Sequence, residues 1–500
     1  MPKPKVSRKI HLEAFAKEFP VFKTDGDVLF CKECNVTIVA EKKSQVKQHM
    51  ESSKHKENTK TNCRKTNQSF LSETINKNNT NQEFCMDLCK TFVAADIPFH
   101  KLTNPHVSNF ISKYTNFTIP DESNIRKNYV KRLYDETLLA ILSEIRNQYL
   151  WISIDETTDD TGRYVANAVV GILSSEEHEC RKRFFLNTAV LDQTNSSTIA
   201  RFFDDSVKIF GPDFNRDSIL LFVSDAAPYM IKAATAIKIF YPKILHVTCL
   251  AHGLHRICEK IRSLFPEVDH MIASMKKVFR KSPSRILMFR ETEPNLTLPP
   301  RPILTRWGTW IEAVRYYANN FETIENILNK ITAEDSAAFE IARNLICNSK
   351  TKLKKDLVYI SSNYQFLCGS ISKLESVGLS LSSQIAIVDE AIKNINNVIG
   401  PTGDLIKEKM TDVIRKNSSF DILKTFANIF IGNQTTSTVK HQYTNTEVMA
   451  FKFAPITSVD IERTFSMYKH FLRSNRQSFT FDNLRHNFVI YCNEALKLTK

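Results

Sequence analysis

Glycine is scarce in this chain, with 11 glycines in 500 residues, well below the usual share of ~7%. Phosphate-binding loops need closely spaced glycines, and neither a Walker-type motif nor a dinucleotide-binding fingerprint occurs in the sequence. The composition therefore argues against glycine-rich phosphate loops and against a nucleotide-hydrolysing motor.

Long apolar runs are also missing. No uninterrupted run approaches the ~20 residues that a bilayer span needs, and the N-terminal stretch MPKPKVSRK lacks the apolar segment of a secretory signal. The eleven cysteines are odd in number and widely scattered, so we expect most to be reduced, buried thiols. These absences predict an intracellular protein without a membrane partner.

Basic residues, by contrast, are in excess. The chain has 68 Lys plus Arg against 54 Asp plus Glu, a formal net charge of +14. An excess of this size favours a polyanionic partner, with nucleic acid ahead of a membrane surface. Five hundred residues also exceed one ordinary core, so we expect two to four domains.

A metal-binding pattern lies near the N-terminus. Cys31-x₂-Cys34 is followed, after fourteen residues, by His49-x₅-His55. Two thiolates from a knuckle and two imidazoles from one helix complete a tetrahedral Zn²⁺ site. The alternative is a chance grouping of Cys and His in a basic surface segment.

The flanks of this pattern agree with a finger. Val28–Phe30 reads as a strand entering the knuckle, and Ser44 is placed to cap the following helix. Lysines surround that helix, and we expect Lys43 and Lys47 to contact DNA phosphates beside a helix that reads a groove.

The central region has the pattern of an α/β fold. Three successive strands before the first helix predict antiparallel pairing, followed by parallel strands added through helices. The expected strands are Tyr149–Asp155, Tyr164–Leu173, Phe184–Leu191, Ser218–Asp225 and Ile244–Leu250, with helices at about 197–210 and 226–240.

Two of these strands are apolar runs that end on a carboxylate, Asp155 and Asp225. In this strand order the two side chains are expected side by side at neighbouring strand ends, although either alone could be a turn residue or a helix cap. A later helix has Ile461, Phe465 and Tyr468 on one face, and Glu462 points elsewhere. Glu462 could therefore reach the two aspartates from a helix packed on the sheet.

Helical periodicity dominates between these parts. A long helix is expected over about 252–281, followed by mostly helical sequence to about residue 445. Within CLAHGLHRIC, four residues at intervals of three (Cys249, His252, His255 and Cys258) suggest a second zinc site. Steps of three rotate by about 300° around a helix, so the four side chains cannot all close on one ion.

These features resemble the hAT-superfamily transposases. The resemblance implies an α/β, RNase H-like mixed sheet interrupted by an all-α insertion domain, with a BED/C2H2-like zinc finger at the N-terminus. It implies that Asp155 in SIDETTDD, Asp225 in FVSDAA and Glu462 in IERTFS are catalytic. Three such carboxylates can hold two Mg²⁺ or Mn²⁺ ions for phosphodiester displacement.

Other motifs of that family also have counterparts here. Cys249 and His252 in CLAH resemble a C-x₂-H motif beside the active site. Arg306 and Trp307 in LTRWGTW resemble an R-W pair that contacts DNA, with the tryptophan stacking on a flipped base. Trp310 is instead expected to anchor the core of the insertion.

The first 150 residues resemble, more specifically, the CGG triplet repeat-binding protein family. The likeness rests on the finger FCKECNVTI and on the stretch LCKTFVAADIPFHKLTNPHVSNFI. It implies a nuclear protein that binds double-stranded DNA.

The predicted organisation follows from both resemblances. The expected parts are a zinc finger (1–60), a flexible linker (61–82), a helical DNA-binding and dimerisation region (83–147), the first part of the core (148–265), the all-α insertion (266–445), and the last part of the core with a C-terminal dimerisation region (446–500). The expected function is a homo-oligomeric transposase that cuts and joins element-end DNA. The alternative is a domesticated DNA-binding transcriptional regulator that does not cut.

Overall fold

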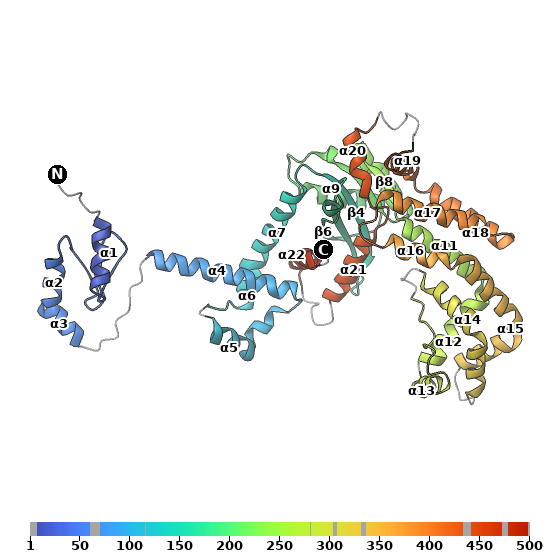
Figure 1. The fold of residues 1–500 in the computed structure, drawn as a ribbon, viewed down its shortest axis with the longest axis horizontal. Helices are drawn as coiled ribbons and strands as arrows, with labels where there is room; N and C mark the ends of the chain where they lie inside the picture. The colour runs from blue at the N-terminus through green and yellow to red at the C-terminus, as the bar shows by residue number, and fades with distance from the viewer. Residues whose placement is uncertain are drawn as a thin grey trace. The chain divides into compact units, whose positions relative to one another are not determined.

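The computed structural model describes residues 8–60, 71–115, 117–280, 282–303, 308–331, 337–433, 442–472 and 479–498. The chain divides into two compact units (Figure 1). The first contains residues 1–89 and 102–121, and the second contains residues 90–101 and 122–500. Arg306 and Trp307 lie outside the described residues.

The first unit begins with a small α/β module. Helix α1 (Arg8–Glu18) precedes a three-stranded antiparallel sheet of β1 (Phe22–Thr24), β2 (Leu29–Cys31) and β3 (Val36–Ile38), and helices α2 (Lys43–Glu51) and α3 (Ser53–Lys60) follow. Asn35 has a positive φ of 55°, which asparagine tolerates better than most residues, and it closes the tight β2–β3 turn. The strand expected at Val28–Phe30 is thus present one residue later.

Helix α4 (Leu71–Ala94) corrects one expectation, because the linker predicted over 61–82 is helical from Leu71 onward. Cys85 and Cys89 are buried one turn apart on this helix. Once a helix is anchored in this way, each further residue that joins it forms one more backbone hydrogen bond at a small cost in conformational entropy, even where the sequence is polar. Helix α5 (Pro105–Tyr114) follows, with Pro105 at its first position and Asn104 as its N-cap.

The second unit is built on a five-stranded mixed sheet, in the order β6-β5-β4-β7-β8. The strands are β4 (Tyr149–Thr158), β5 (Tyr164–Leu173), β6 (Arg183–Leu191), β7 (Ile219–Ser224) and β8 (Leu245–Thr248). Strands β4, β5 and β6 pair antiparallel, whereas β7 pairs parallel to β4 and β8 parallel to β7. The predicted pairing pattern is confirmed.

Helices cover both faces of this sheet, which is why its strands are apolar on both sides. Even-numbered residues of β4, such as Ile152 and Ile154, pack in one core with α7 (Val130–Ile145), α9 (Ser196–Lys208) and α10 (Pro228–Phe240). Because successive side chains of a strand alternate between faces, Ser153 and Asp155 lie on the opposite face, where α21 (Val459–Phe471) contacts β4 and β5.

A helical array fills the chain between β8 and the C-terminal helices, and residues 266–433 contain no strand wherever they are described. The long helix expected over 252–281 is two helices, α11 (Leu250–Leu264) and α12 (Pro266–Arg280), because Pro266 cannot continue the first one. The array continues with α13 (Pro283–Thr292), α14 (Thr309–Lys330), α15 (Ala337–Tyr364), α16 (Phe366–Leu374), α17 (Leu381–Asn396), α18 (Pro401–Arg415) and α19 (Phe420–Phe430). Trp310 is buried in it and donates its indole N–H to Asp269 Oδ1 at 3.0 Å, as expected of a core anchor.

The remaining elements are short or join these layers. They are η1 (Phe99–Thr103), α6 (Glu122–Asn124), the π-helical turn η2 (Ile125–Tyr129), α8 (Glu177–Cys180), η3 (Arg216–Ser218), α20 (Asn445–Ala450), η5 (Phe451–Phe453) and α22 (Phe481–Leu498). None of the helices in the described ranges is long and apolar enough to span a bilayer. None of the ten described cysteines is in a disulfide, in line with the expected thiols.

Candidate functional site

The structure brings the four predicted zinc ligands together in the first unit. The donor atoms of Cys31, Cys34, His49 and His55 all lie within 4.8 Å of one another. His55 Nδ1 is 3.3 Å from Cys31 Sγ and 3.2 Å from Cys34 Sγ. Ligands at Zn–S of about 2.3 Å and Zn–N of about 2.0 Å occupy a tetrahedron of similar size, so this Cys2His2-like group can bind Zn²⁺.

Burial supports this reading of the quartet. His49 Nε2 is buried and has no hydrogen-bond partner in the described part of the chain, as expected of a nitrogen that would coordinate a metal ion. Burial, and then the neighbouring His55, lower the pKa of His49, which keeps the imidazole in the neutral form that binds metals.

Two local expectations about the finger were wrong. The two imidazoles lie on different helices, because the chain leaves helical geometry at Ser52 between α2 and α3. Ser44 lies inside α2 rather than at its start, where Lys42 is the N-cap and Gln45 accepts from the Lys42 backbone N–H at 2.9 Å.

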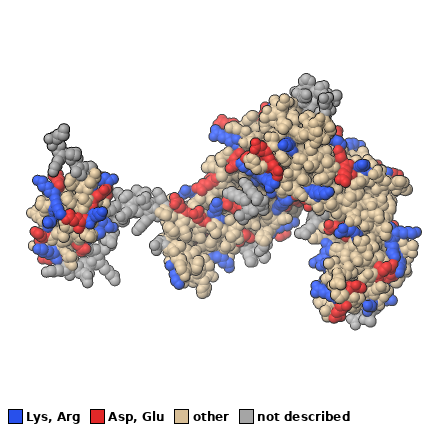
Figure 2. Space-filling view, viewed as in Figure 1, with Lys and Arg blue, Asp and Glu red and all other residues tan. Residues whose placement is uncertain are grey.

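The two predicted DNA-contacting lysines differ in their surroundings. Lys43 makes an ion pair with Glu18, and its ammonium lies 5.7 Å from the Phe19 ring centroid. Lys47 is exposed one turn further along α2. Figure 2 shows basic and acidic side chains mixed over the finger in this view. Lys47 is therefore the more available of the two for a phosphate.

The second site lies where β4 and β7 diverge. Their parallel ladder ends at Ser153↔Val223, and Asp155 and Asp225 are each two residues past that last pair. Asp155 does not end its strand, because β4 continues to Thr158 through antiparallel pairing with β5. It is nevertheless at the point where pairing with β7 has stopped, so the expected side-by-side placement of the two aspartates follows from the register.

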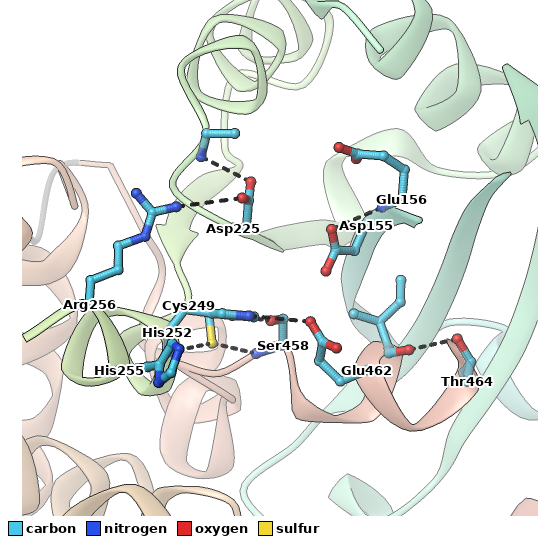
Figure 3. A network of polar contacts seen from close by, with 12 residues as sticks. Asp155, Glu156, Asp225, Cys249, His252, His255, Arg256, Ser458, Glu462 and Thr464 are labelled. Carbon is cyan, nitrogen blue, oxygen red and sulfur yellow. Dashed lines mark hydrogen bonds and ion pairs between the residues drawn. The ribbon is translucent and has the colours of Figure 1, made fainter. Parts of the chain in front are cut away.

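Helix α21 brings Glu462 to the same region from a distant part of the chain (Figure 3). Ile461, Phe465 and Tyr468 are buried on one face of the helix, as predicted. Thr464, on that same side, accepts a hydrogen bond of 2.9 Å from Asn167 Nδ2, and Asn167 pairs directly opposite Asp155. Glu462 in the first turn is left pointing toward Asp155.

Cys249 and His252 hold Glu462 in place. The Cys249 thiol accepts from the Ser458 N–H at 3.2 Å, and His252 Nε2 lies 3.3 Å from Glu462 Oε1. Burial alone would lower the pKa of His252, but Cys249 and then Glu462 raise it to about 11. The imidazole is therefore a cation that fixes and partly neutralises the carboxylate. His255 and Cys258 do not join a metal-holding group in the described residues.

The carboxylates act on one another electrostatically. Burial, and then the charges of Glu462, Asp225 and Glu156, raise the pKa of Asp155 well above its ordinary value. Glu462 lies within hydrogen-bonding reach of both His252 and Asp155, and its pKa is lowered chiefly by His252, against the opposing effect of burial. Asp225 is held by the Ala227 N–H at 3.0 Å and has Arg256 at 3.9 Å.

Glu156 is a fourth acid that the sequence reading missed. It points to the opposite face of the sheet from Asp155, where the Tyr229 hydroxyl donates to its Oε1. Its Oε2 is buried and has no hydrogen-bond partner among the described residues. The available signal was strand alternation, since a glutamate directly after an inward-facing aspartate must face the helix on the other side.

Comparison with known proteins gives matches to two families. Residues 6–61 match the CGGBP1 N-terminal domain, and residues 120–278 match a family described as Domain of unknown function (DUF659). CGG triplet repeat-binding protein 1 of Homo sapiens is 31% identical over 121 residues, which are 22% of this chain and 72% of that protein. The N-terminal part of the chain belongs to the CGG triplet repeat-binding protein family.

The DUF659 match covers most residues of the carboxylate site. Asp155, Asp225, Cys249 and His252 all fall within residues 120–278, whereas Glu462 lies outside them. DUF659 is a hAT-like domain family, so the two matches indicate a hAT-related protein, as the sequence motifs suggested.

The donor set suits a hard divalent cation, which prefers carboxylate oxygens. A cation would also relieve the mutual repulsion that raises the pKa of Asp155. Within the described residues, however, the finger quartet is the group whose donor atoms converge, and Asp155, Asp225 and Glu462 do not form such a group.

Proposed function

We propose that this protein is a DNA-binding, hAT-type transposase that cuts and joins element-end DNA by metal-assisted phosphodiester displacement. The observation that carries the proposal is the approach of Asp155, Asp225 and Glu462 from β4, the β7–α10 connection and α21 to one edge of the sheet (Figure 3). A structural role alone does not account for three acids gathered where burial, Glu462 and Asp225 all raise the pKa of Asp155.

The sheet supports an RNase H-like reading of the core. Three antiparallel strands are followed by two parallel ones in the order β6-β5-β4-β7-β8, and the helical array separates this core from α21. We propose the domain plan that follows: a finger over 1–60, a helical DNA-binding and dimerisation region over 83–147, core parts over 148–265 and 446–500, and an all-α insertion over 266–445.

Asp155, Asp225 and Glu462 would hold Mg²⁺ or Mn²⁺, which when bound activates an attacking oxygen and stabilises the leaving one. The chain's own groups set up that site. His252 and the buried thiol of Cys249 hold Glu462, and Arg256 lies beside Asp225. Positions fixed before substrate arrives lower the cost of ordering the site during reaction.

The finger would deliver the DNA. Zn²⁺ bound by Cys31, Cys34, His49 and His55 would fix the knuckle against α2 and α3, and Lys47, with Lys43 once it leaves Glu18, would contact phosphates. The relative named as binding CGG triplet repeats suggests a CGG-repeat duplex as one probe. Arg306 and Trp307 would also contact the DNA, and the protein would act as a nuclear homo-oligomer.

The test is a cleavage assay with the full chain. Duplexes selected by binding, together with the genomic DNA flanking the gene, are incubated with protein and Mg²⁺ or Mn²⁺. Wild type should nick them, and Asp155→Asn, Asp225→Asn and Glu462→Gln should each lose nicking while they still bind. Asp160→Asn, which changes an exposed acid near the end of β4, serves as the matched control and should nick as wild type does.

The outcomes separate the two functions. If wild type binds DNA tightly but nicks no substrate with either metal, the enzyme proposal is wrong and a domesticated DNA-binding regulator is the better description. That alternative is favoured by one observation, that the three carboxylates do not converge as the zinc ligands do among the described residues. Unchanged nicking in all three variants would instead remove the proposed catalytic assignment.

A further inference from the structure

Gln384 is a buried polar side chain where the helical array meets the sheet-containing core. It lies in the first turn of α17 and is 5% exposed. Burying a carboxamide is costly unless its donors and its acceptor find partners. The partners of Gln384 therefore show what this position does.

The carboxamide binds the backbone of residues 454–458, the segment that leads into α21. Oε1 accepts from the Ile456 N–H at 3.1 Å, and Nε2 donates to the Ala454 carbonyl at 3.0 Å. Nε2 also donates to the Leu379 carbonyl at 3.0 Å, in the loop before α17. Both amide hydrogens and the amide oxygen are thus used, and the segment is fixed to α17 at two points.

The core holds the same segment from its other side. The Ile456 carbonyl accepts from the Leu250 N–H at 3.0 Å, and the Ser458 N–H donates to the Cys249 thiol at 3.2 Å. Residues 454–458 form neither helix nor strand, although Ile456 and Ser458 are at most 1% exposed. A buried segment without a regular ladder of its own takes its position from such bonds.

This segment sets the position of Glu462. Ser458 is the N-cap of α21, and its carbonyl accepts from the Glu462 N–H at 3.2 Å in the first turn (Figure 3). Because the turn is hydrogen-bonded, a shift of the segment moves Glu462 with it. Glu462 Oε1 lies 3.3 Å from His252 Nε2, so a shift of about 1 Å would break this contact.

A second connection joins the array to the same turn of α21. Arg463 donates from Nη2 to the carbonyl of Glu375, the C-cap of α16, at 3.2 Å, and from Nη1 to Asp460 Oδ1 at 3.0 Å. Asp460 Oδ1 in turn lies 3.2 Å from Arg183 Nε in β6. These residues and Gln384 line a cavity of about 60 Å³. Directional bonds, rather than close packing alone, therefore set the spacing here.

We propose that Gln384 is a positioning residue through which the helical array sets Glu462 relative to Asp155, and so determines how well the carboxylate site holds Mg²⁺ or Mn²⁺. The inference rests on the metal binding in the proposed function, but it does not require cutting. A displacement of α17 would move residues 454–458 and Glu462 together, which makes the array a regulator of the site.

The test is Mn²⁺ binding by the full, zinc-loaded chain without DNA, measured from the electron paramagnetic resonance of free Mn²⁺. Gln384→Met keeps the length of the side chain but forms none of the three bonds. It should raise the Kd for Mn²⁺ at least about tenfold, since residues behind the metal ligands typically change metal affinity by that factor or more. Asp155→Asn should remove the same binding, which assigns it to the carboxylate site.

Two further variants separate positioning from stability. Ser382→Ala removes a bond from the same helix to the Ala427 carbonyl, 3.2 Å away inside the array, and should leave the Mn²⁺ affinity unchanged even where it lowers the melting temperature. Arg463→Gln breaks the second connection at a side chain that is 42% exposed, so this variant should fold and should weaken Mn²⁺ binding by a smaller factor than Gln384→Met.

The Mn²⁺ measurements decide the proposal. An unchanged Kd in folded Gln384→Met would overturn it, and so would an equal loss of affinity in Ser382→Ala. Absence of Mn²⁺ binding that depends on Asp155 in wild type would also overturn it, because there would be no metal site to position. If Gln384→Met does not fold, Arg463→Gln decides alone, and an unchanged affinity in that variant counts against the proposal.

Nicking assays distinguish this inference from the proposed function. If Gln384→Met weakens Mn²⁺ binding but wild type nicks no DNA, the positioning role stands and the transposase activity does not. If wild type nicks DNA, Gln384→Met should lower kcat and leave the KM for DNA unchanged. Equal kcat in the two proteins would overturn the positioning role and leave the proposed function standing.

Discussion

Replacing Tyr229 with phenylalanine tests the link between α10 and β4 next to the carboxylate site. Backbone pairing between β4 and β7 has stopped at Ser153, and the bond from the Tyr229 hydroxyl to Glu156 crosses from one side of this opening to the other. Burial, and then Glu156, raise the pKa of Tyr229, so the phenol remains a protonated donor. Tyr229→Phe removes this donor and changes little else in shape.

The expected loss follows from the state of Glu156. A hydrogen bond to a charged acceptor contributes about 1.5 to 3 kcal/mol, and the second oxygen of Glu156 has no partner among the described residues to compensate. We therefore expect the free energy of unfolding to fall by about 2 kcal/mol near neutral pH, an order-of-magnitude value for a partly buried carboxylate.

The loss should also depend on pH. Burial raises the pKa of Glu156 above its ordinary 4.5, and the Tyr229 bond opposes that rise. The Tyr229 hydroxyl binds the ionised Glu156 carboxylate more strongly than the protonated acid. Its contribution to the free energy of unfolding is therefore complete above the pKa of Glu156 in the folded protein and decreases as the pH falls through that pKa. Tyr229→Phe should therefore cost less, about 1 kcal/mol, once Glu156 is protonated.

Urea unfolding followed by circular dichroism, near neutral pH and near pH 4.5, measures both values. Tyr164→Phe changes an exposed tyrosine and should have no effect. In a double-mutant cycle, Tyr229→Phe should lower the free energy of unfolding less in the Glu156→Gln background than in wild type. A neutral-pH loss below about 0.5 kcal/mol, or strict additivity in the cycle, would show that the two side chains do not interact.

Three further predictions concern the finger and the core. Cys31→Ser should remove one equivalent of zinc, measured by elemental analysis, and weaken duplex binding at least about tenfold because structural zinc supplies the folding energy of such modules; Cys347→Ser, at an exposed cysteine, should retain both. Burial lowers the pKa of His246 from 6.5 to about 4, so the imidazole stays neutral in the folded protein near neutral pH. Its contribution to the free energy of unfolding is therefore complete above pH 6.5 and should fall by about 3 kcal/mol as the pH approaches 4. If the free energy of unfolding of His246→Gln falls equally steeply with pH, this prediction is wrong. Asp155→Asn should raise the melting temperature of metal-free protein at neutral pH by relieving a buried charge, whereas Mn²⁺ should stabilise wild type alone; equal Mn²⁺ stabilisation of both would place the ion elsewhere.

Much of the sheet was predictable because its signals are local. The Tyr164–Leu173 strand is observed with the predicted bounds, and the other four expected strands begin and end within a few residues of prediction. Continuous apolar runs with carboxylate or turn residues at their ends define such strands without tertiary information. The zinc quartet was equally readable, since ligand type and spacing alone restrict the site.

The errors arose where a local pattern had more than one solution. A helical period continues across Pro266, but the ring ends one helix and begins another. His49 and His55 have spacing that one helix could accommodate, yet the chain breaks at Ser52. The polar stretch before Cys85 looked like a linker because its own residues lack apolar anchors, and those anchors are further along the same helix.

Local sequence patterns do not predict that the C-terminal helices pack against the sheet. Buried asparagines in the sequence nevertheless indicate this packing. Asn167 is a fully buried amide in an apolar strand, and it donates to Thr464 of α21. Asn493 of α22 is also buried, and its amide both accepts from the Phe185 N–H at 3.1 Å and donates to the Phe185 carbonyl at 2.8 Å. A buried amide without a partner costs more than its hydrogen bond returns. An asparagine inside an apolar run therefore indicates a distant polar partner. In this fold the acceptor for the Asn167 amide N–H is Thr464, on the same helix that brings Glu462 toward Asp155.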